Sequence, residues 1–152
     1  MLQLTKEQFV QIVAQGLEGK PLEICGLLAG DFDGSDETSS TRVREVYAVE
    51  SDDKSEFTYT INAIGYMKAT RDAEKRGMKI VGIYHTHPAT VAYPSKTDVA
   101  RAHWGDTDDL LFPDYSYLIV SLRDPQNPEP HSFKINGRRL PEDVEEEEVV
   151  IS

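Results

Sequence analysis

The polar and apolar pattern near the N-terminus predicts a helix followed by a buried strand. Apolar residues recur there at three- and four-residue spacing, the period of an amphipathic helix: Phe9, Ile12, Val13 and Leu17. The preceding Thr5-Lys6-Glu7-Gln8 has the form of a capping box, in which a Thr side chain and a Gln three residues later cap the helix start. We expect this helix to end near residues 16–19. The short apolar run 24–32 that follows is typical of a buried strand.

The next part of the chain predicts a loop, two strands and a helix. The polar stretch 33–41 is expected to be a hairpin loop. Two alternating patterns then predict strands, the first with Val43, Glu45, Tyr47 and Val49 on one face and the second with Phe57, Tyr59 and Ile61. Asn62 is placed to cap a helix that runs to about Arg76, with Gly77 just past its end. Its inward side chains are expected to be Ile64, Met67 and Ala73.

The second half of the chain mixes strands and helices in no strict order. The apolar run 78–84 predicts a strand, 95–104 a helix that starts just after Pro94, and 115–122 a strand rich in β-forming residues. Residues 131–135 and 149–152 have the pattern of edge strands. Because strands and helices do not alternate regularly, the fold class expected is α+β, a mixed α/β sheet with flanking helices in a single domain.

Composition narrows the class of protein. A chain of 152 residues that is 39% hydrophobic suits one globular domain. No stretch of 18 apolar residues is present, the N-terminus lacks a secretory pattern, and one cysteine excludes an internal disulfide, so a cytoplasmic protein with no membrane partner is expected. The formal net charge of −11 argues against nucleic acid as a partner.

The acidic residues are unevenly distributed. Most of them fall in four segments, and the rest of the chain carries a net positive charge: 31–41, 50–56, 106–109 and 142–148. Two explanations remain open, that these segments keep the chain in solution or that they orient an acidic partner protein against the basic remainder.

The segment 84–98, YHTHPATVAYPSKTD, carries the clearest chemical signal. His85 and His87 are two residues apart at the end of an apolar strand, so both imidazoles face the same side of a sheet. Asp98 follows in the first turn of the next helix, and a loop of this length can return its carboxylate to the same place. Two His and one carboxylate leave a fourth tetrahedral position for water, which is the layout of a catalytic rather than a structural zinc site.

Each part of this pattern has a simpler interpretation. A His-x-His pair alone is a weak signal, and Ser95 with Asp98 also forms an ordinary helix cap that needs no metal. The joint pattern H-x-H-P-x6-S-x2-D is expected by chance on the order of once in 10⁵ chains of this length. The cap and the metal site are also compatible, because a capped first turn would hold the carboxylate rigidly.

This segment resembles the JAMM motif of the JAMM/MPN-domain zinc metalloproteases, whose pattern is H-[ST]-H-P-x6-S-x2-D with a distant upstream Glu. The stretches 21–30, 77–88 and 115–122 are also similar to that family, and the resemblance covers roughly residues 1–135, most closely in its stand-alone prokaryotic kind. It implies a curved mixed β-sheet flanked by helices. On this basis we expect an MPN-like domain over residues 1–140 and an acidic C-terminal tail over 141–152.

The resemblance also implies roles for particular residues. His85, His87 and Asp98 would bind Zn²⁺, Glu23 would be the general base, and Ser95 would donate a hydrogen bond to the oxyanion. The implied reaction is hydrolysis of a peptide or isopeptide bond at the extended C-terminal tail of a ubiquitin-like or sulfur-carrier protein. Since members of this fold often pair, a homodimer is compatible with the resemblance.

Other functions and other catalytic residues are also compatible with parts of the sequence. Many members of the wider fold family are catalytically silent interaction modules, although those typically lack motif residues and this chain has all five. A barrel amidohydrolase also uses His-x-His on a strand, but the chain is too short for a barrel of ~250 residues. Cys25 as a nucleophile, and His103 with Trp104 as lining of a substrate groove, are weaker hypotheses than ordinary packing.

Overall fold

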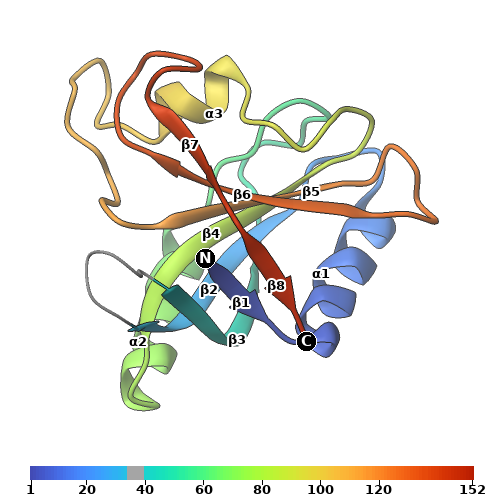
Figure 1. The fold of residues 1–152 in the computed structure, drawn as a ribbon, viewed down its shortest axis with the longest axis vertical. Coiled ribbons are helices and arrows are strands. Elements are labelled where there is room, and N and C mark those ends of the chain that lie inside the picture. The colour runs from blue at the N-terminus through green and yellow to red at the C-terminus, as the bar shows by residue number, and fades with distance from the viewer. Residues whose placement is uncertain (34–39) are drawn as a thin grey trace.

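The computed structural model describes residues 1–33 and 40–152 (Figure 1). The hairpin loop expected at 33–41 lies, except for its ends, outside the described residues. The described elements are, in chain order, β1 (Leu2–Leu4), α1 (Lys6–Gly19), β2 (Cys25–Asp33), β3 (Ser40–Val49), α2 (Ala63–Lys75), β4 (Lys79–His87), α3 (Lys96–Arg101), β5 (Ser116–Ser121), β6 (Glu129–Ile135), β7 (Val144–Glu147) and β8 (Val149–Ile151). The mixed α/β content and single sheet confirm the expected fold class.

The helices begin where the sequence predicts because their caps are local. The Thr5 hydroxyl accepts the backbone N–H of Gln8, and the Gln8 side chain accepts the N–H of Thr5, so the predicted capping box is present. The side chain of Asn62 accepts the N–H of Gly65 at the start of α2. Past the end of α2, Gly77 has φ +74°, a left-handed conformation that glycine adopts without a steric penalty.

The strands form one sheet whose two edges are joined by the end of the chain. The order is β7-β6-β5-β4-β2-β3-β1-β8, with β2 antiparallel to β3 and β4, and β4 parallel to β5. The two strands at opposite edges, β7 and β8, are separated in the sequence by Glu148 alone. The sheet must therefore curl strongly, and Figure 1 shows β7 and β8 as nearly one ribbon that crosses it.

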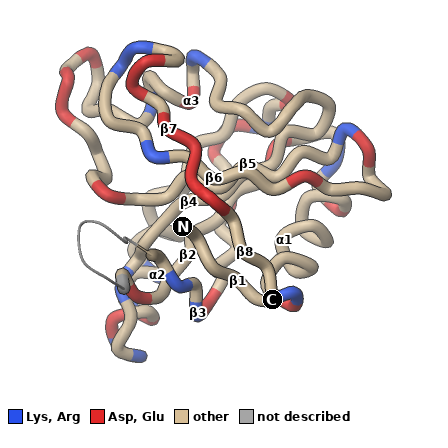
Figure 2. The backbone as a smooth tube through the Cα atoms, viewed as in Figure 1, with Lys and Arg blue, Asp and Glu red and all other residues tan. Residues whose placement is uncertain are grey.

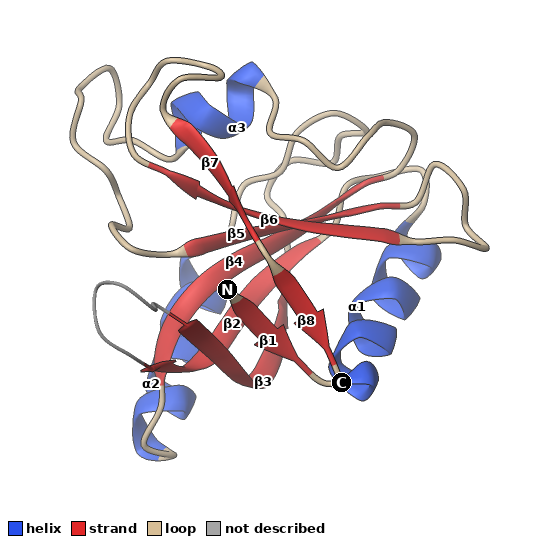
Figure 3. Cartoon of the chain, in the orientation of Figure 1, coloured by secondary structure: helices blue, strands red, loops and turns tan. Residues whose placement is uncertain are grey.

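Each face of the curled sheet packs against different helices (Figure 3). On one face α1 contributes Ile12 to a core that includes Leu28, Val81 and Tyr84. On the other face α2 and α3 contribute small side chains to a second core, among them Ala69, Ala73, Val99 and Ala102. The second face also carries Ile83, which precedes the His-x-His pair by two residues, so the candidate site belongs to the side covered by α2 and α3.

Three local expectations are wrong. Residues 57–61 form no strand; apart from one bridge between Ser51 and Ile61, this segment is irregular. Its Thr58 and Thr60 side chains bond Asp53 instead of pairing along a ladder. The alternating pattern was misleading because alternation predicts a strand only where a neighbouring strand is available to pair with it.

The other two errors concern which side chains face inward. Ile64 and Met67 of α2 are exposed, and the inner side of the helix is formed by Ala69 and Ala73. Val43 does not share a core with Val49, because the β2–β3 register shifts between Ala29 and Gly30. A bulge of this kind moves the residues beyond it to the opposite face.

The segment 141–152, expected as an acidic tail, contributes β7 and β8 to the sheet. Its acidic residues lie along β7 and immediately beside it in the sequence (Figure 2). No helix in the described part of the chain is both long enough and apolar enough to span a membrane.

Candidate metal centre

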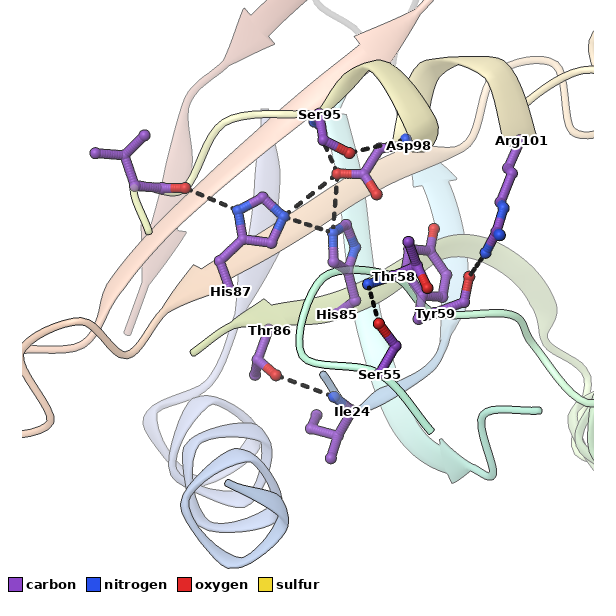
Figure 4. A network of polar contacts seen from close by, with 11 residues as sticks. Ile24, Ser55, Thr58, Tyr59, His85, Thr86, His87, Ser95, Asp98 and Arg101 are labelled. Atoms are coloured by element: carbon purple, nitrogen blue, oxygen red, sulfur yellow. Dashed lines mark hydrogen bonds and ion pairs between the residues drawn. The ribbon is translucent and has the colours of Figure 1, made fainter. Parts of the chain in front are cut away.

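Four side chains that could bind a metal ion meet at the end of β4. Glu23, His85, His87 and Asp98 are all buried, and one ligand atom from each lies within 4.8 Å of the others. The two imidazoles approach through their Nε2 atoms, 3.1 Å apart, and each Nε2 lies 3.3 Å from Asp98 Oδ2. Figure 4 shows the side chains of His85, His87 and Asp98 pointing toward one another. The structure thus brings together the three expected metal ligands and the expected upstream Glu.

The strand β4 positions both imidazoles. It runs through His87 and is buried along almost its whole length. His85 lies opposite Cys25 of β2 and opposite Ile119 of β5, so the strand that carries it has neighbours on both sides. Since alternate side chains of a strand share a face, the predicted orientation of the His pair is confirmed.

The start of α3 positions the carboxylate. Ser95 Oγ accepts the backbone N–H of Asp98 at 3.0 Å, and Asp98 Oδ2 accepts the N–H of Ser95 at 2.9 Å, which is a complete capping box. The oxygen that caps the helix is the same Oδ2 that faces both imidazoles. The cap and the candidate metal site are therefore one structure, as the sequence allowed.

A hydrogen bond on the far side of His87 determines which of its nitrogens carries the proton. Its Nδ1 lies 2.8 Å from the carbonyl oxygen of Val91. A carbonyl oxygen only accepts, so Nδ1 must be the donor, and Nε2 of the neutral ring presents a lone pair to the cluster. Metal-binding His residues are commonly oriented by such a bond to a backbone carbonyl.

Glu23 approaches from the segment that precedes β2. Its backbone N–H donates to the Ser55 carbonyl. The next N–H, of Ile24, donates to the Thr86 hydroxyl on β4 (Figure 4). These bonds bring the segment against the strand of the His pair. The Glu23 side chain is 5% exposed, and its Oε1 has no hydrogen-bond partner among the described residues.

The burial of these groups changes their acidity. Desolvation, only partly offset by His87, raises the pKa of Glu23 from 4.5 to about 8. Burial lowers the pKa of His85. Burial also opposes the charged forms of His87 and Asp98. The pKa of Asp98 nevertheless lies below its usual range, because of the charge of His85 and hydrogen bonds with His85 and His87, and the pKa of His87 is raised by its hydrogen bonds to Asp98 and the Val91 carbonyl.

An aromatic ring that sequence analysis did not assign to the site covers one side of it. The Tyr59 ring stacks on His85 with centroids 4.2 Å apart. The segment that carries Tyr59 is tied to α3 by Arg101, which donates to the Tyr59 carbonyl (Figure 4). Arg101 also donates to the Asp53 carboxylate. The sequence showed Tyr59 only as part of an alternating pattern, and nothing in that pattern pointed to His85.

The cluster opens into a groove of about 460 Å³. Three of the expected site residues, Glu23, His87 and Ser95, line it, together with Lys20, Pro21, Glu56, Phe57, Pro88, Ala89 and Thr90. A larger and mainly apolar cavity of about 670 Å³ lies on the other side of Tyr59, and none of the four clustered residues lines it. For substrate access to the cluster the smaller groove is therefore the relevant one.

Cys25, His103 and Trp104 do not belong to the cluster of four side chains. Cys25 is fully buried, and desolvation raises the pKa of its thiol to about 12, which is unfavourable for a nucleophile. His103 is buried and lines the larger cavity, with its Nδ1 close to the Val99 carbonyl. Trp104 is exposed and does not line either cavity.

The donor set fits a transition-metal ion such as zinc. Two imidazole nitrogens and a carboxylate oxygen suit such an ion. The unpartnered Oε1 of Glu23 also points to a missing partner, because buried polar atoms are nearly always hydrogen-bonded in proteins. His85, His87 and Asp98 would hold the ion, and Glu23 would remain free beside it.

Comparisons with known proteins identify relatives of this chain. A family model described as prokaryotic homologs of the JAB domain matches residues 5–136. A protein of Mycobacterium tuberculosis named CysO-cysteine peptidase is 36% identical over 124 residues, which cover 82% of this chain and 75% of that protein. A protein of Haloferax volcanii named desampylase is 32% identical over 117 residues, 76% of this chain and 75% of that protein.

Solved structures share the fold. The solution structure of a Desulfitobacterium hafniense protein matches with a TM-score of 0.83 and 34% identity, covering 100% of this chain and 93% of that one. A JAB1/MPN domain protein from Archaeoglobus fulgidus matches with a TM-score of 0.50 at 17% identity, over 99% of this chain and 95% of that one, which shows the fold alone.

Proposed function

The chain belongs to the family of prokaryotic homologs of the JAB domain, and from that premise we propose that it is a zinc-dependent peptidase that cleaves conjugates of small ubiquitin-like or sulfur-carrier proteins. Its relatives are named peptidases, and the chain is a peptidase or isopeptidase of the JAMM type. The observation that carries the zinc-dependent mechanism is the convergence of four buried groups, one of them a Glu with an unpartnered oxygen.

The metal ligands in this proposal are His85, His87 and Asp98. A zinc ion held by them supplies Lewis acidity that lowers the pKa of water to roughly 7. The protein contributes rigidity to this site: the Val91 carbonyl fixes the His87 ring, the Tyr59 ring covers His85, and the α3 cap holds Asp98. Val91 and Tyr59 do not line the groove that a substrate would enter, whereas Ser95 of the α3 cap does.

Glu23 is the proposed general base. Its unpartnered Oε1 is the atom available to take a proton from the attacking water and then to give it to the leaving amine. In the metal-free protein the raised pKa keeps this carboxyl largely protonated near neutrality. The positive charge of a metal ion held by His85, His87 and Asp98 would lower the pKa of Glu23 and favour the ionised carboxylate that a base requires. Glu23 would therefore act as a base only when those three ligands hold the ion.

Ser95 is the proposed donor to the oxyanion. Its Oγ accepts the Asp98 N–H, which leaves the hydroxyl proton free to donate. Ser95 also lines the groove with Glu23 and His87, so a carbonyl group bound there could meet donor and base together. A fixed donor of this kind stabilises the charge that develops on the carbonyl oxygen.

The proposed substrate is a small carrier protein with an extended C-terminal tail that ends in Gly-Gly. The relatives named CysO-cysteine peptidase, desampylase and probable TtuB-protein conjugate cleaving protease support this class of substrate. Two kinds of leaving group are compatible with it, an amino acid attached through its α-amine and a lysine side chain of another protein. Pairing of two copies of the chain stays a prediction.

The test is a cleavage assay against a panel of ubiquitin-like and sulfur-carrier proteins with C-terminal extensions, with zinc content measured in parallel. We expect about one zinc per chain, cleavage after the tail, loss of cleavage with a chelator, and loss of cleavage in Glu23→Gln with zinc retained. Chelator-insensitive cleavage or full activity of Glu23→Gln would contradict the mechanism. A protein without zinc or cleavage would instead be a catalytically silent interaction module.

A further inference from the structure

The groove beside the metal centre contains one basic side chain, Lys20, among its described lining residues. We propose that Lys20 binds the α-carboxylate of the leaving group, so that the enzyme releases a single amino acid from the end of a carrier protein rather than freeing a lysine side chain. This inference rests on the proposed function and decides between the two leaving groups that it left open.

Contacts with the sheet fix the position of the Lys20 ammonium. Its Nζ donates to the carbonyl oxygen of Leu122 at 2.9 Å, just past the end of β5. The backbone N–H of Leu122 donates in turn to the carbonyl of His87 at 3.0 Å. Two consecutive hydrogen bonds therefore connect the ammonium to the end of the strand that carries the candidate ligands, although Lys20 is 102 residues from Leu122 in the sequence.

The ammonium has unused capacity for an anion. A lysine has three N–H donors, and one hydrogen bond is found for Lys20. No carboxylate of the described residues lies within 4.0 Å of it, whereas other basic residues, such as Arg101 and Arg76, are paired with acids. The residue is half-buried, and a half-buried charge without a counter-ion is unfavourable unless a ligand supplies one.

The two acidic residues that line the groove, Glu56 and Glu23, do not pair with the Lys20 ammonium. Glu56 also lines it but is exposed and has no ion pair with Lys20. Glu23 is assigned to the base. A carboxylate that enters the groove therefore meets Lys20, the one Lys or Arg among the described residues that line it.

The chemistry of the bond explains why this cation discriminates between leaving groups. Hydrolysis adds water to the carbonyl carbon of the last Gly, breaks the C–N bond and leaves a carboxylate on the carrier and a protonated amine on the product. When the amine belongs to a free amino acid, its α-carboxylate is one carbon away and must lie in the same groove. When the amine is a lysine side chain, no such charge is present there.

The experiment compares leaving groups that differ in one charge. The panel carrier that is cleaved fastest is prepared with a single alanine after Gly-Gly, once as the free acid and once as the carboxamide, and also as a conjugate to the side chain of an internal lysine. We expect wild type to favour the acid over the carboxamide in kcat/KM by at least about tenfold, the range of a hydrogen bond to a charged group. In Lys20→Gln the two rates should become equal, and Lys20→Arg should partly restore the preference.

Lys134→Gln is the matched control. Lys134 is also half-buried and also donates to a backbone carbonyl, that of Asp114. Among the described residues it likewise has no acidic partner, but it does not line the groove. This variant should keep the wild-type ratio of acid to carboxamide. Because Lys20→Gln also loses its bond to Leu122, the ratio within each variant, and not the absolute rate, is the readout.

A binding measurement separates this inference from the proposed function. Affinities of the acid and carboxamide conjugates are measured with Glu23→Gln and with the double variant Glu23→Gln/Lys20→Gln, where no turnover is needed. Tighter binding of the acid that disappears with Lys20→Gln supports the inference even if cleavage is absent. Equal acid and carboxamide binding and rates in wild type, or a ratio that survives Lys20→Gln, would overturn it while cleavage itself stands.

Discussion

Two nearly buried glutamates in different regions of the molecule have opposite surroundings. Glu147 lies in the C-terminal clasp, residues 144–151, where β7 and β8 join the edges of the sheet. Its Oε2 accepts from the hydroxyls of Ser116 and Ser132 at 2.7 and 2.9 Å, and its Oε1 lies 3.2 Å from the amino group of Met1. Glu23, in the candidate metal centre, has an Oε1 with no partner among the described residues.

The difference shows how burial of the same residue type can serve structure or function. A buried carboxylate whose oxygens are all bonded holds segments together, and removing it leaves its partners unsatisfied. A buried carboxylate with an unused oxygen and a raised pKa costs stability and is typical of a functional site. Mutations in the clasp are therefore expected to lower the free energy of unfolding. Mutations in the candidate metal centre are expected to lower the zinc content or the rate of turnover.

The largest effect should come from the ligands of the metal centre. His87→Ala removes an imidazole and should reduce bound zinc from about one to near zero per chain and cleavage by about 10³-fold or more. Ser132→Ala, which removes a β6 hydroxyl that donates to Glu147 of the clasp, should leave zinc content unchanged. Metal analysis and the cleavage assay check this, and a zinc-loaded, active His87→Ala protein would exclude His87 as a ligand.

The two glutamates themselves provide the sharpest contrast. Glu23→Gln should keep zinc and lose about 10²- to 10⁴-fold in kcat, because general acid–base transfer is removed. Glu147→Gln should keep kcat but lower the free energy of unfolding by about 1–3 kcal/mol, because two serine hydroxyls and an amino group lose their charged partner. Urea unfolding and turnover are measured on both variants; the comparison breaks down if either variant shows the effect expected of the other.

The two capping boxes allow a smaller version of the same test. Ser95→Ala and Thr5→Ala each remove an N-cap and should each cost about 1 kcal/mol of stability. Ser95→Ala should in addition lower kcat by about 10²-fold, because the oxyanion loses a donor. Equal kcat values for the two variants would show that Ser95 only caps α3, and Ser95→Thr should recover both properties if the hydroxyl is what matters.

The last expected effect is a pH dependence of the free energy of unfolding in the metal-free protein. The pKa of Glu23 is raised from 4.5 to about 8 on folding, so between these values the native state binds more protons than the unfolded state. The contribution of Glu23 to stability is therefore fully present below pH 4.5 and is lost as the pH rises through 8. The free energy of unfolding is measured in urea at pH 5.5 and 8.0, in the presence of a chelator, for wild type and for Glu23→Gln. Wild type should lose stability relative to Glu23→Gln as the pH rises. The same difference between the two proteins at both pH values would contradict the raised pKa of Glu23.

Features that depend on short-range patterns were predictable from the sequence. The capping boxes at Thr5 and Ser95 involve residues three apart, and their geometry follows from the start of a helix. The shared face of His85 and His87 follows from the two-residue period of a strand. Once Asp98 is placed in the first turn of α3, the core of the candidate site could be predicted with no knowledge of the sheet order.

Features that depend on distant partners were not predictable in this way. The alternation at 57–61 suggested a strand, but Arg101 and Asp53 hold this segment in an irregular path that places Tyr59 against His85. The bulge beside Gly30 moved Val43 to the other face, and the clasp took up a segment expected to be a tail. No local period carries information about any of these contacts.

The sequence by itself determined the kinds of ligand, their spacing and the caps that hold them, because these are set by backbone periods over a few residues. The tertiary structure alone decided that Glu23 Oε1 is buried without a hydrogen-bond partner among the described residues and that the Val91 carbonyl orients His87. It also decided that Lys20 lies in the groove, held by the carbonyl of Leu122, 102 residues away in the sequence. The physical reason is that burial and the pairing of distant polar groups arise only when the curled sheet closes, and these two properties set charge, acidity and access at the site.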